Sequence, residues 1–147
     1  MITLQTEHFI AAPPSEVWAV LADFASYGEW NPFMTDARGT AAVGGTLVCT
    51  VRAVDGSGKT YRMRGRILEC DPPRALSWRG GTWPLLTGRH YFRLLPREGG
   101  TRLIHGEEFR GLYPWWVGPE RVETFRPKYE GINRALAARV LAGGGGD

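Results

Sequence analysis

The clearest periodic pattern in the chain lies near its C-terminus, over residues 119–141. Apolar side chains recur there at steps of three and four, which places them on one stripe of an amphipathic α-helix. The stripe consists of Val122, Phe125, Tyr129, Ile132, Leu136 and Val140. Pro127 lies inside this pattern, where a proline removes a backbone hydrogen bond. Because the stripe keeps its phase across Pro127, the pattern predicts one helix kinked at this residue; a helix that begins near Thr124 is the alternative.

From Met34 onward, a pattern of period two predicts β-strands. The expected strands span residues 34–40, 46–54, 59–70, 74–80, 87–96 and 101–111, after a first strand at 3–10. The loops between the later strands are short, so neighbouring strands should be antiparallel. In the strand at 59–70, apolar residues and glycine alternate with three arginines, which leaves one face of the sheet dry.

Two short helices are expected between the first strand and the later ones. Pro13 and Pro14 suit the first turn of a helix, and an apolar side follows over residues 17–21. A second short helix or turn is expected at 23–29. The order of elements predicts an α+β fold, in which a curved antiparallel sheet of about seven strands wraps around the long C-terminal helix. We expect one domain over residues 1–142 and a flexible glycine-rich tail over 143–147.

The charge distribution argues against a nucleic-acid partner. The net charge of +3 comes almost wholly from arginines spread along the chain, whereas a nucleic-acid footprint is concentrated. The exception is Arg62, Arg64 and Arg66, which form either a solvated outer face, the commoner outcome for such a pattern, or a surface that binds anions or nucleic acid. The apolar runs are too short to span a bilayer and the N-terminus lacks a signal pattern. We therefore expect a cytoplasmic protein without stable membrane insertion; its oligomeric state stays open.

The last two strands allow their pairing to be predicted. If residues 97–100 form the connecting loop, directly opposed residues have numbers that sum to 197. His90 then faces Glu107, and Phe92 faces His105. The same register places Arg89 opposite Glu108 on the other face, a favourable charge pair across the strands. Leucines 94 and 103 assign the first face to the interior, so the two histidines and Glu107 lie on the concave side of the sheet.

Three titratable groups on an apolar wall are the strongest candidates for chemistry. His90, His105 and Glu107 have the residue types of an acid–base site acting on a carbonyl compound. A hydrogen-bonded polar patch that orients a ligand is the alternative, and we assign no catalytic residue. The histidines lack zinc-site spacing, so no metal is expected. No GxGxxG or GxxxxGK[ST] motif is present, so no cofactor is expected. Cys49 and Cys70 do not form a CxxC pair and are expected to be buried thiols.

Aromatic residues are numerous and are predicted to line a ligand cavity between sheet and helix. Ordinary core packing is the alternative for each of them. The candidate ligand-binding residues are Trp30, Tyr61, Met63, Trp78, His90, Phe92, His105, Glu107, Phe109, Trp115, Phe125 and Tyr129. Residues 112–116 are expected to form a loop at the cavity mouth. Trp115 and Trp116 in this loop would serve as a lid, a membrane contact or a partner contact.

Several motifs resemble one known superfamily over essentially the whole chain. They are the PPSEVW opening of the first helix, the YGEWNPF turn at 27–33, the GGTRL entry to the last strand and the closing amphipathic helix. These motifs resemble the START-like, Bet v 1-like (SRPBCC) superfamily, and within it the polyketide cyclase/dehydrase and lipid-transport proteins. The resemblance implies a helix-grip fold with a cavity between the sheet and the C-terminal helix.

The superfamily includes carriers, cyclases, quinone-binding proteins and co-chaperone domains, so the fold does not fix the function. We expect the protein to bind a small hydrophobic or aromatic molecule, such as a lipid, a polyketide-like compound or a quinone-like compound. A cyclase or dehydratase that uses His90, Glu107 and His105 as acid and base is one alternative. A co-chaperone-like interaction module is the other.

Overall fold

The structure, a computed structural model, describes residues 1–144. Its elements are β1 (Ile2–Ile10), α1 (Pro14–Leu21), the 3-10 turn η1 (Phe24–Ser26), α2 (Tyr27–Trp30), β2 (Met34–Gly39), β3 (Thr46–Arg52), β4 (Thr60–Asp71), β5 (Ala75–Thr82), β6 (Leu86–Arg97), β7 (Gly100–Arg110), α3 (Leu112–Glu123) and α4 (Arg126–Gly144). The expected tail at 143–147 begins inside α4, which includes Gly143 and Gly144. Its last three residues lie outside the described part of the chain.

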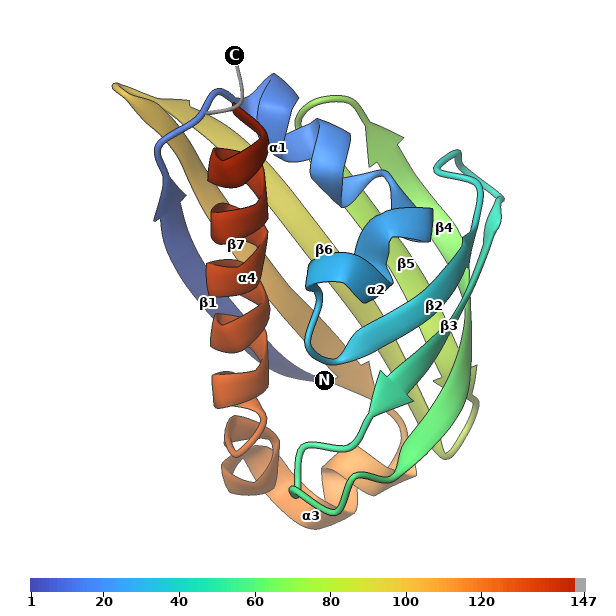
Figure 1. The fold of residues 1–147 in the computed structure, drawn as a ribbon. Helices are drawn as coiled ribbons and strands as arrows, with labels where there is room; N and C mark the ends of the chain where they lie inside the picture. Colours follow the sequence, from blue (N-terminus) through green and yellow to red (C-terminus); the bar gives the residue numbers. More distant parts are fainter. Residues whose placement is uncertain (145–147) are drawn as a thin grey trace.

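The seven strands form one antiparallel sheet in the order β1-β7-β6-β5-β4-β3-β2. The sheet curves, and α4 runs along its concave side together with α1 and α2 (Figure 1). This arrangement confirms the predicted α+β helix-grip fold. β1 pairs with β7 along its whole length, so the N-terminal strand lies next to the last one and beneath α4.

The hairpin of β6 and β7 has the predicted register. His90 opposes Glu107, Phe92 opposes His105, and Arg89 opposes Glu108. The connection is tighter than the expected four-residue loop, because Arg97 and Gly100 themselves pair and only two residues form the turn. Gly99 has a φ of 79°, in the left-handed region that such tight turns require and that glycine adopts without strain.

The C-terminal region contains two helices, so the prediction of one helix kinked at Pro127 is wrong. α3 ends at Glu123, α4 begins at Arg126, and the alternative start near Thr124 is close to the observed one. Pro127 lies in the first turn of α4, where its missing N–H has no intrahelical partner to lose. The expected loop at 112–116 is also wrong, because these residues form the start of α3. Gly118 interrupts α3 with a φ of 82°.

Two groups of buried side chains hold the sheet to the helices. The larger group joins α1, α2 and the C-terminal half of α4 to the sheet, and Leu136, fully buried, belongs to it. The smaller group consists of Leu4, Phe109, Val122 and Tyr129, near the junction of α3 and α4. Burying each such side chain contributes about 1.5–3 kcal/mol. Side chains of both groups reach the same internal space, which is the candidate site.

Candidate functional site

A cavity of about 380 Å³ lies between the sheet, α3 and α4. This volume is within the range of small-molecule sites. Most of its wall is apolar and comes from Met34, Val51, Val54, Met63, Trp78, Leu86, Phe109, Val122 and Phe125. Most of the exposed wall residues, such as Val54 and Tyr113, belong to the β3–β4 loop and α3, and the others lie near the ends of β3, β4 and β5. Trp78 and His90 are buried, so the cavity runs from an exposed mouth beside α3 into the interior.

Eight of the twelve predicted ligand-binding residues line this cavity. They are Tyr61, Met63, Trp78, His90, Glu107, Phe109, Phe125 and Tyr129. The other four do not line it. Phe92 and His105 stack on each other in the core, with ring centroids 4.2 Å apart, and Trp30 packs against Tyr27. Trp115 is 81% exposed. The helical turn over residues 112–116 brings Tyr113 and Pro114 to the cavity and leaves Trp115 on the solvent side.

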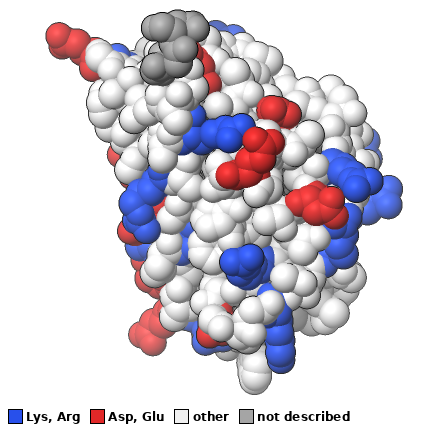
Figure 2. All heavy atoms as spheres, in the orientation of Figure 1, with Lys and Arg blue, Asp and Glu red and all other residues white. Residues whose placement is uncertain are grey.

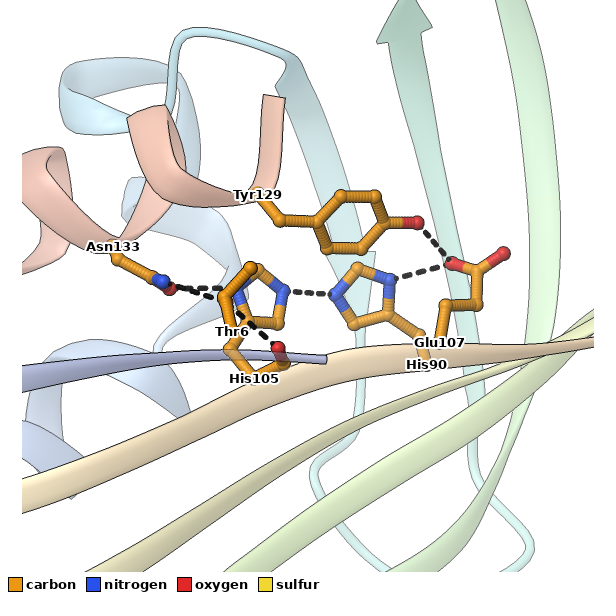
Figure 3. Close-up of polar contacts among 6 residues, drawn as sticks. All are labelled: Thr6, His90, His105, Glu107, Tyr129 and Asn133. Carbon is orange, nitrogen blue, oxygen red and sulfur yellow. Dashed lines mark hydrogen bonds and ion pairs between the residues drawn. The ribbon is translucent and has the colours of Figure 1, made fainter. Parts of the chain in front are cut away.

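The polar groups at the inner end of the cavity form one continuous hydrogen-bonded chain (Figure 3). His90 Nδ1 lies 2.9 Å from Glu107 Oε1, and His90 Nε2 lies 2.6 Å from His105 Nε2. The Tyr129 hydroxyl donates to the same Glu107 Oε1 at 2.9 Å. At the far end, His105 Nδ1 lies 2.7 Å from Asn133 Oδ1. The β6–β7 register and α4 therefore together position an acid, two imidazoles and a phenol.

Thr6 sets the directions of the hydrogen bonds from Asn133 to His90. The Thr6 hydroxyl donates to the backbone carbonyl of His105, so its oxygen is free to accept from Asn133 Nδ2. Asn133 Oδ1 must then accept the proton of His105 Nδ1. A neutral His105 is left with an unprotonated Nε2, which accepts from His90 Nε2–H. The position of the proton between His90 Nδ1 and Glu107 Oε1 remains to be assigned.

One proton lies between His90 Nδ1 and Glu107 Oε1. Either His90 is an imidazolium that donates to a carboxylate, or a protonated Glu107 donates to a neutral imidazole. Burial raises the pKa of Glu107, but the hydrogen bond and charge of His90, with further help from Lys128 and Tyr129, outweigh it and leave this pKa below its usual value. The carboxylate and imidazolium pair is therefore the favoured form.

Burial keeps His105 neutral. Burial and the neighbouring His90 lower the pKa of His105 well below its usual value. The hydrogen bond with Asn133 raises this pKa but offsets only part of the lowering. Tyr129 is held in its protonated form, because burial and the adjacent Glu107 raise its pKa well above the usual range. The network thus has two fixed members and one proton that can shift between His90 and Glu107.

Glu107 also presents a free oxygen. Oε1 accepts both hydrogen bonds, whereas Oε2 accepts none from residues 1–144 and points away from His90 and Tyr129 in Figure 3. Gly88, on β6, provides the room for this carboxylate. A Cβ added at Gly88 would lie 3.0 Å from Glu107 Cδ and closer still to Oε2. Both residues line the cavity, so Oε2 is available to a ligand.

Lys128 is a site residue that the sequence reasoning missed. It lines the cavity, with its ammonium group 5.9 Å from the Phe33 ring centroid and 6.0 Å from that of Tyr129. Burial lowers its pKa, and the charge of Glu107 partly offsets this effect. The signal was its place on the helix, because Lys128 lies three residues after Phe125 and four before Ile132. Asn133 follows Ile132 on the same side and was missed for the same reason.

The fold and the site define a helix-grip protein with a largely apolar internal cavity. The sequence matches the polyketide cyclase/dehydrase and lipid transport family over residues 1–141, so the chain belongs to this family. Among curated protein sequences, none is similar enough to count as a relative.

Solved structures share the fold at low sequence identity. A protein from Rhodobacter sphaeroides is 23% identical, with a TM-score of 0.77, over 96% of this chain and 93% of its own. The Zhui aromatase/cyclase from Streptomyces sp. R1128 is 20% identical, with a TM-score of 0.71, over 95% and 93% of the two chains. Ara h 8.0201 is 18% identical, with a TM-score of 0.74, over 95% and 97%.

Within residues 1–144, no helix is long and apolar enough to cross a membrane. The same part of the chain has no group of three or more His, Cys, Asp or Glu side chains arranged to hold a metal ion.

Proposed function

We propose that the protein binds a small, flat, apolar molecule that carries an oxygen atom at one end. The observation that carries this proposal is the cavity itself: an apolar wall closed at its inner end by a few polar groups. Ligand sites typically combine such walls with a small number of placed polar groups that fix the ligand's orientation. A cavity of this size also favours ligand binding over the protein-interaction module, for which a filled interior would be expected.

The polar groups determine which end of the ligand enters first. Glu107 Oε2 accepts a hydrogen bond from a hydroxyl, whereas the ammonium group of Lys128 donates to a carbonyl or hydroxyl oxygen. Trp78 stacks on His90 with ring planes 11° apart and provides a flat wall next to these groups. A phenol, a quinone or a ketone of a fused-ring compound would satisfy both the wall and the polar end.

Equilibrium dialysis with naphthalene and 2-naphthol tests this orientation. Both share one apolar body, and only naphthol carries the oxygen. We expect naphthol to bind about two- to twelvefold more tightly, as one hydrogen bond of about 0.5–1.5 kcal/mol predicts. Lys128→Met should reduce this preference and leave naphthalene binding unchanged. The proposal would be contradicted if neither compound bound the wild-type protein, or if Lys128→Met preferred naphthol over naphthalene as strongly as the wild type does.

The chain of hydrogen bonds favours a second candidate function, an enzyme that moves a proton. Glu107 and His90 hold one shiftable proton, and Glu107 Oε2 faces the cavity. The carboxylate would remove a proton from the carbon next to a bound carbonyl group, and the Lys128 ammonium would stabilise the negative charge on the carbonyl oxygen. Returning the proton from Glu107 to the carbon completes an exchange. In a dehydratase, the enolate would instead expel a β-hydroxyl group, which takes the proton from Glu107 and leaves as water. In a cyclase, the enolate carbon would form a bond to a second carbonyl carbon, whose oxygen takes that proton.

Deuterium exchange of a flat ketone distinguishes the enzyme from a pure binder. Wild-type protein and 2-tetralone in D₂O are followed by NMR, and a catalyst should accelerate exchange next to the carbonyl by about 10²- to 10⁴-fold. Glu107→Gln should abolish the acceleration and leave tetralone affinity largely intact. Equal loss of exchange and affinity would reject the catalytic role while leaving the binding proposal in place.

A further inference from the structure

One end of the molecule presents several large apolar side chains to solvent. We call it the tip and define it as residues 83–85, between β5 and β6, with residues 112–116 at the start of α3. Trp83, Trp115 and Trp116 are 70%, 81% and 79% exposed, and Leu85 and Leu112 are exposed as well. The Leu112 amide donates to the Pro84 carbonyl and the Tyr113 amide to the Leu85 carbonyl, both at 2.9 Å. The two segments therefore form a single surface.

Arginines flank the tip on the outer face of the sheet. Arg110 ends β7 directly before the tip, and Arg64 lies on β4 next to the end of β5. Behind them, Arg66 opposes Arg79, which in turn opposes Arg89. Like charges directly opposed across strands destabilise a sheet. An anionic partner would compensate for this repulsion.

Only one of these arginines is neutralised within the described residues. Arg89 pairs with Glu108, and its hydrogen bond, with the charges of Arg110 and Arg79, lowers the pKa of that carboxyl. The other four, Arg64, Arg66, Arg79 and Arg110, are exposed and form no ion pair among residues 1–144. In Figure 2 the lowest part of the molecule, where α3 lies in Figure 1, consists of uncharged atoms, with both basic and acidic side chains above it.

We propose that the tip docks on the surface of a lipid bilayer that contains anionic phospholipids. Tryptophan is suited to the boundary between headgroups and acyl chains, because its ring is apolar and its N–H is polar. Arginines near an anionic leaflet add electrostatic attraction. The tryptophans protrude from two short segments beside the basic residues, and this arrangement matches the layered chemistry of a membrane surface. Docking of this kind is peripheral and requires no helix that spans the membrane.

The tip lies next to the mouth of the cavity. Tyr113 and Pro114 belong to the tip and also line the cavity, together with Leu86 at the start of β6. A docked protein would therefore hold the cavity mouth against the bilayer, where apolar molecules are dissolved. The docking goes beyond the proposed function, because vesicle binding needs no ligand in the cavity.

Vesicle flotation tests the proposal. Wild-type protein should float with phosphatidylcholine vesicles that contain phosphatidylserine and should bind more weakly to vesicles of phosphatidylcholine alone. The double variant Trp115→Ser/Trp116→Ser should bind the anionic vesicles at least about tenfold more weakly. Arg64→Glu/Arg110→Glu should lose at least about 25-fold, because each basic residue near an anionic surface contributes about fivefold.

Matched controls lie at the opposite end of the sheet. Phe9→Ser removes an exposed aromatic ring, and Arg93→Glu/Arg97→Glu makes the same change in net charge as the arginine variant of the tip. Both should bind vesicles like the wild type. Absence of vesicle binding, or equal losses in the tip and control variants, would overturn the proposal. If the tryptophan variant instead abolishes a dimer seen by sedimentation and leaves vesicle binding unchanged, the tip is a contact between two copies and the proposal is wrong.

Discussion

Replacing Glu107 by glutamine tests the hydrogen-bond directions at the inner end of the cavity. In the form with a Glu107 carboxylate, His90 donates from both ring nitrogens, to His105 and to Glu107, and carries a positive charge. Glutamine has nearly the shape of glutamate but provides no counter-charge. His90 is only 6% exposed. The imidazolium in the variant must either remain unpaired in the interior or lose its proton together with one hydrogen bond.

Breaking a buried ion pair by removing one partner costs about 3–5 kcal/mol. The side chains of His90 and Glu107 are 7% and 19% exposed, so solvent at the cavity weakens the pair only in part. We therefore expect Glu107→Gln to lower the free energy of unfolding by about 3 kcal/mol at neutral pH. The matched variant Tyr129→Phe removes one hydrogen bond to the same oxygen and should cost about 1.5 kcal/mol.

The loss of unfolding free energy caused by Glu107→Gln should depend on pH with a defined sign. The pKa of Glu107 is lower in the folded protein than its usual value of 4.5. The carboxylate therefore contributes stability that is fully present above about pH 4.5 and is lost as the pH falls through the lower, folded-state pKa. Urea unfolding followed by circular dichroism should show the difference between wild type and Glu107→Gln narrowing in acid. A loss below about 1 kcal/mol at neutral pH, or a difference that widens in acid, would refute the assigned directions.

Three further predictions follow from local geometry. Gly88→Ala should lower the free energy of unfolding by about 1–3 kcal/mol in urea unfolding, because its Cβ would press on the Glu107 carboxylate, whereas Gly131→Ala in α4 should be neutral or stabilising. Pro127→Ala should change the melting temperature little, because the proline lies in the first turn of α4; a large change would indicate that the residue is a structural kink. Burial raises the pKa of Cys49 to about 11, so a thiol reagent at mildly alkaline pH should label it more slowly than the half-buried Cys70; faster labelling of Cys49 would contradict its burial.

The sheet was predictable from the sequence because its signals are local. Alternation along each strand and the Glu98-Gly99 turn fix the register of β6 and β7, and with it the opposition of His90 and Glu107. The helical region was harder. A proline breaks or kinks the middle of a helix but is favourable in its first turn. The apolar stripe continues on both sides of Pro127, so it does not show which of these positions the proline occupies.

The polar part of the site was only half predictable. Pairing within one hairpin brought His90, His105 and Glu107 together, but the partners from α4 and β1 depend on how the helix sits on the sheet. Lys128 and Asn133 look like ordinary polar residues beside an apolar stripe until that packing is known. Thr6 is 99 residues from the carbonyl it contacts, and no sequence pattern joins the two.

The most direct test of the proposed function is native mass spectrometry of two proteins in one tube. Wild-type protein is mixed with Met63→Trp, which differs in mass and places an indole inside the cavity, and 2-naphthol is added. Met63 lines the cavity wall, so the larger side chain should occupy the ligand's space. The account predicts a naphthol adduct on the wild-type protein and none, or far less, on the variant. Equal adducts on both proteins, or none on either, would contradict it.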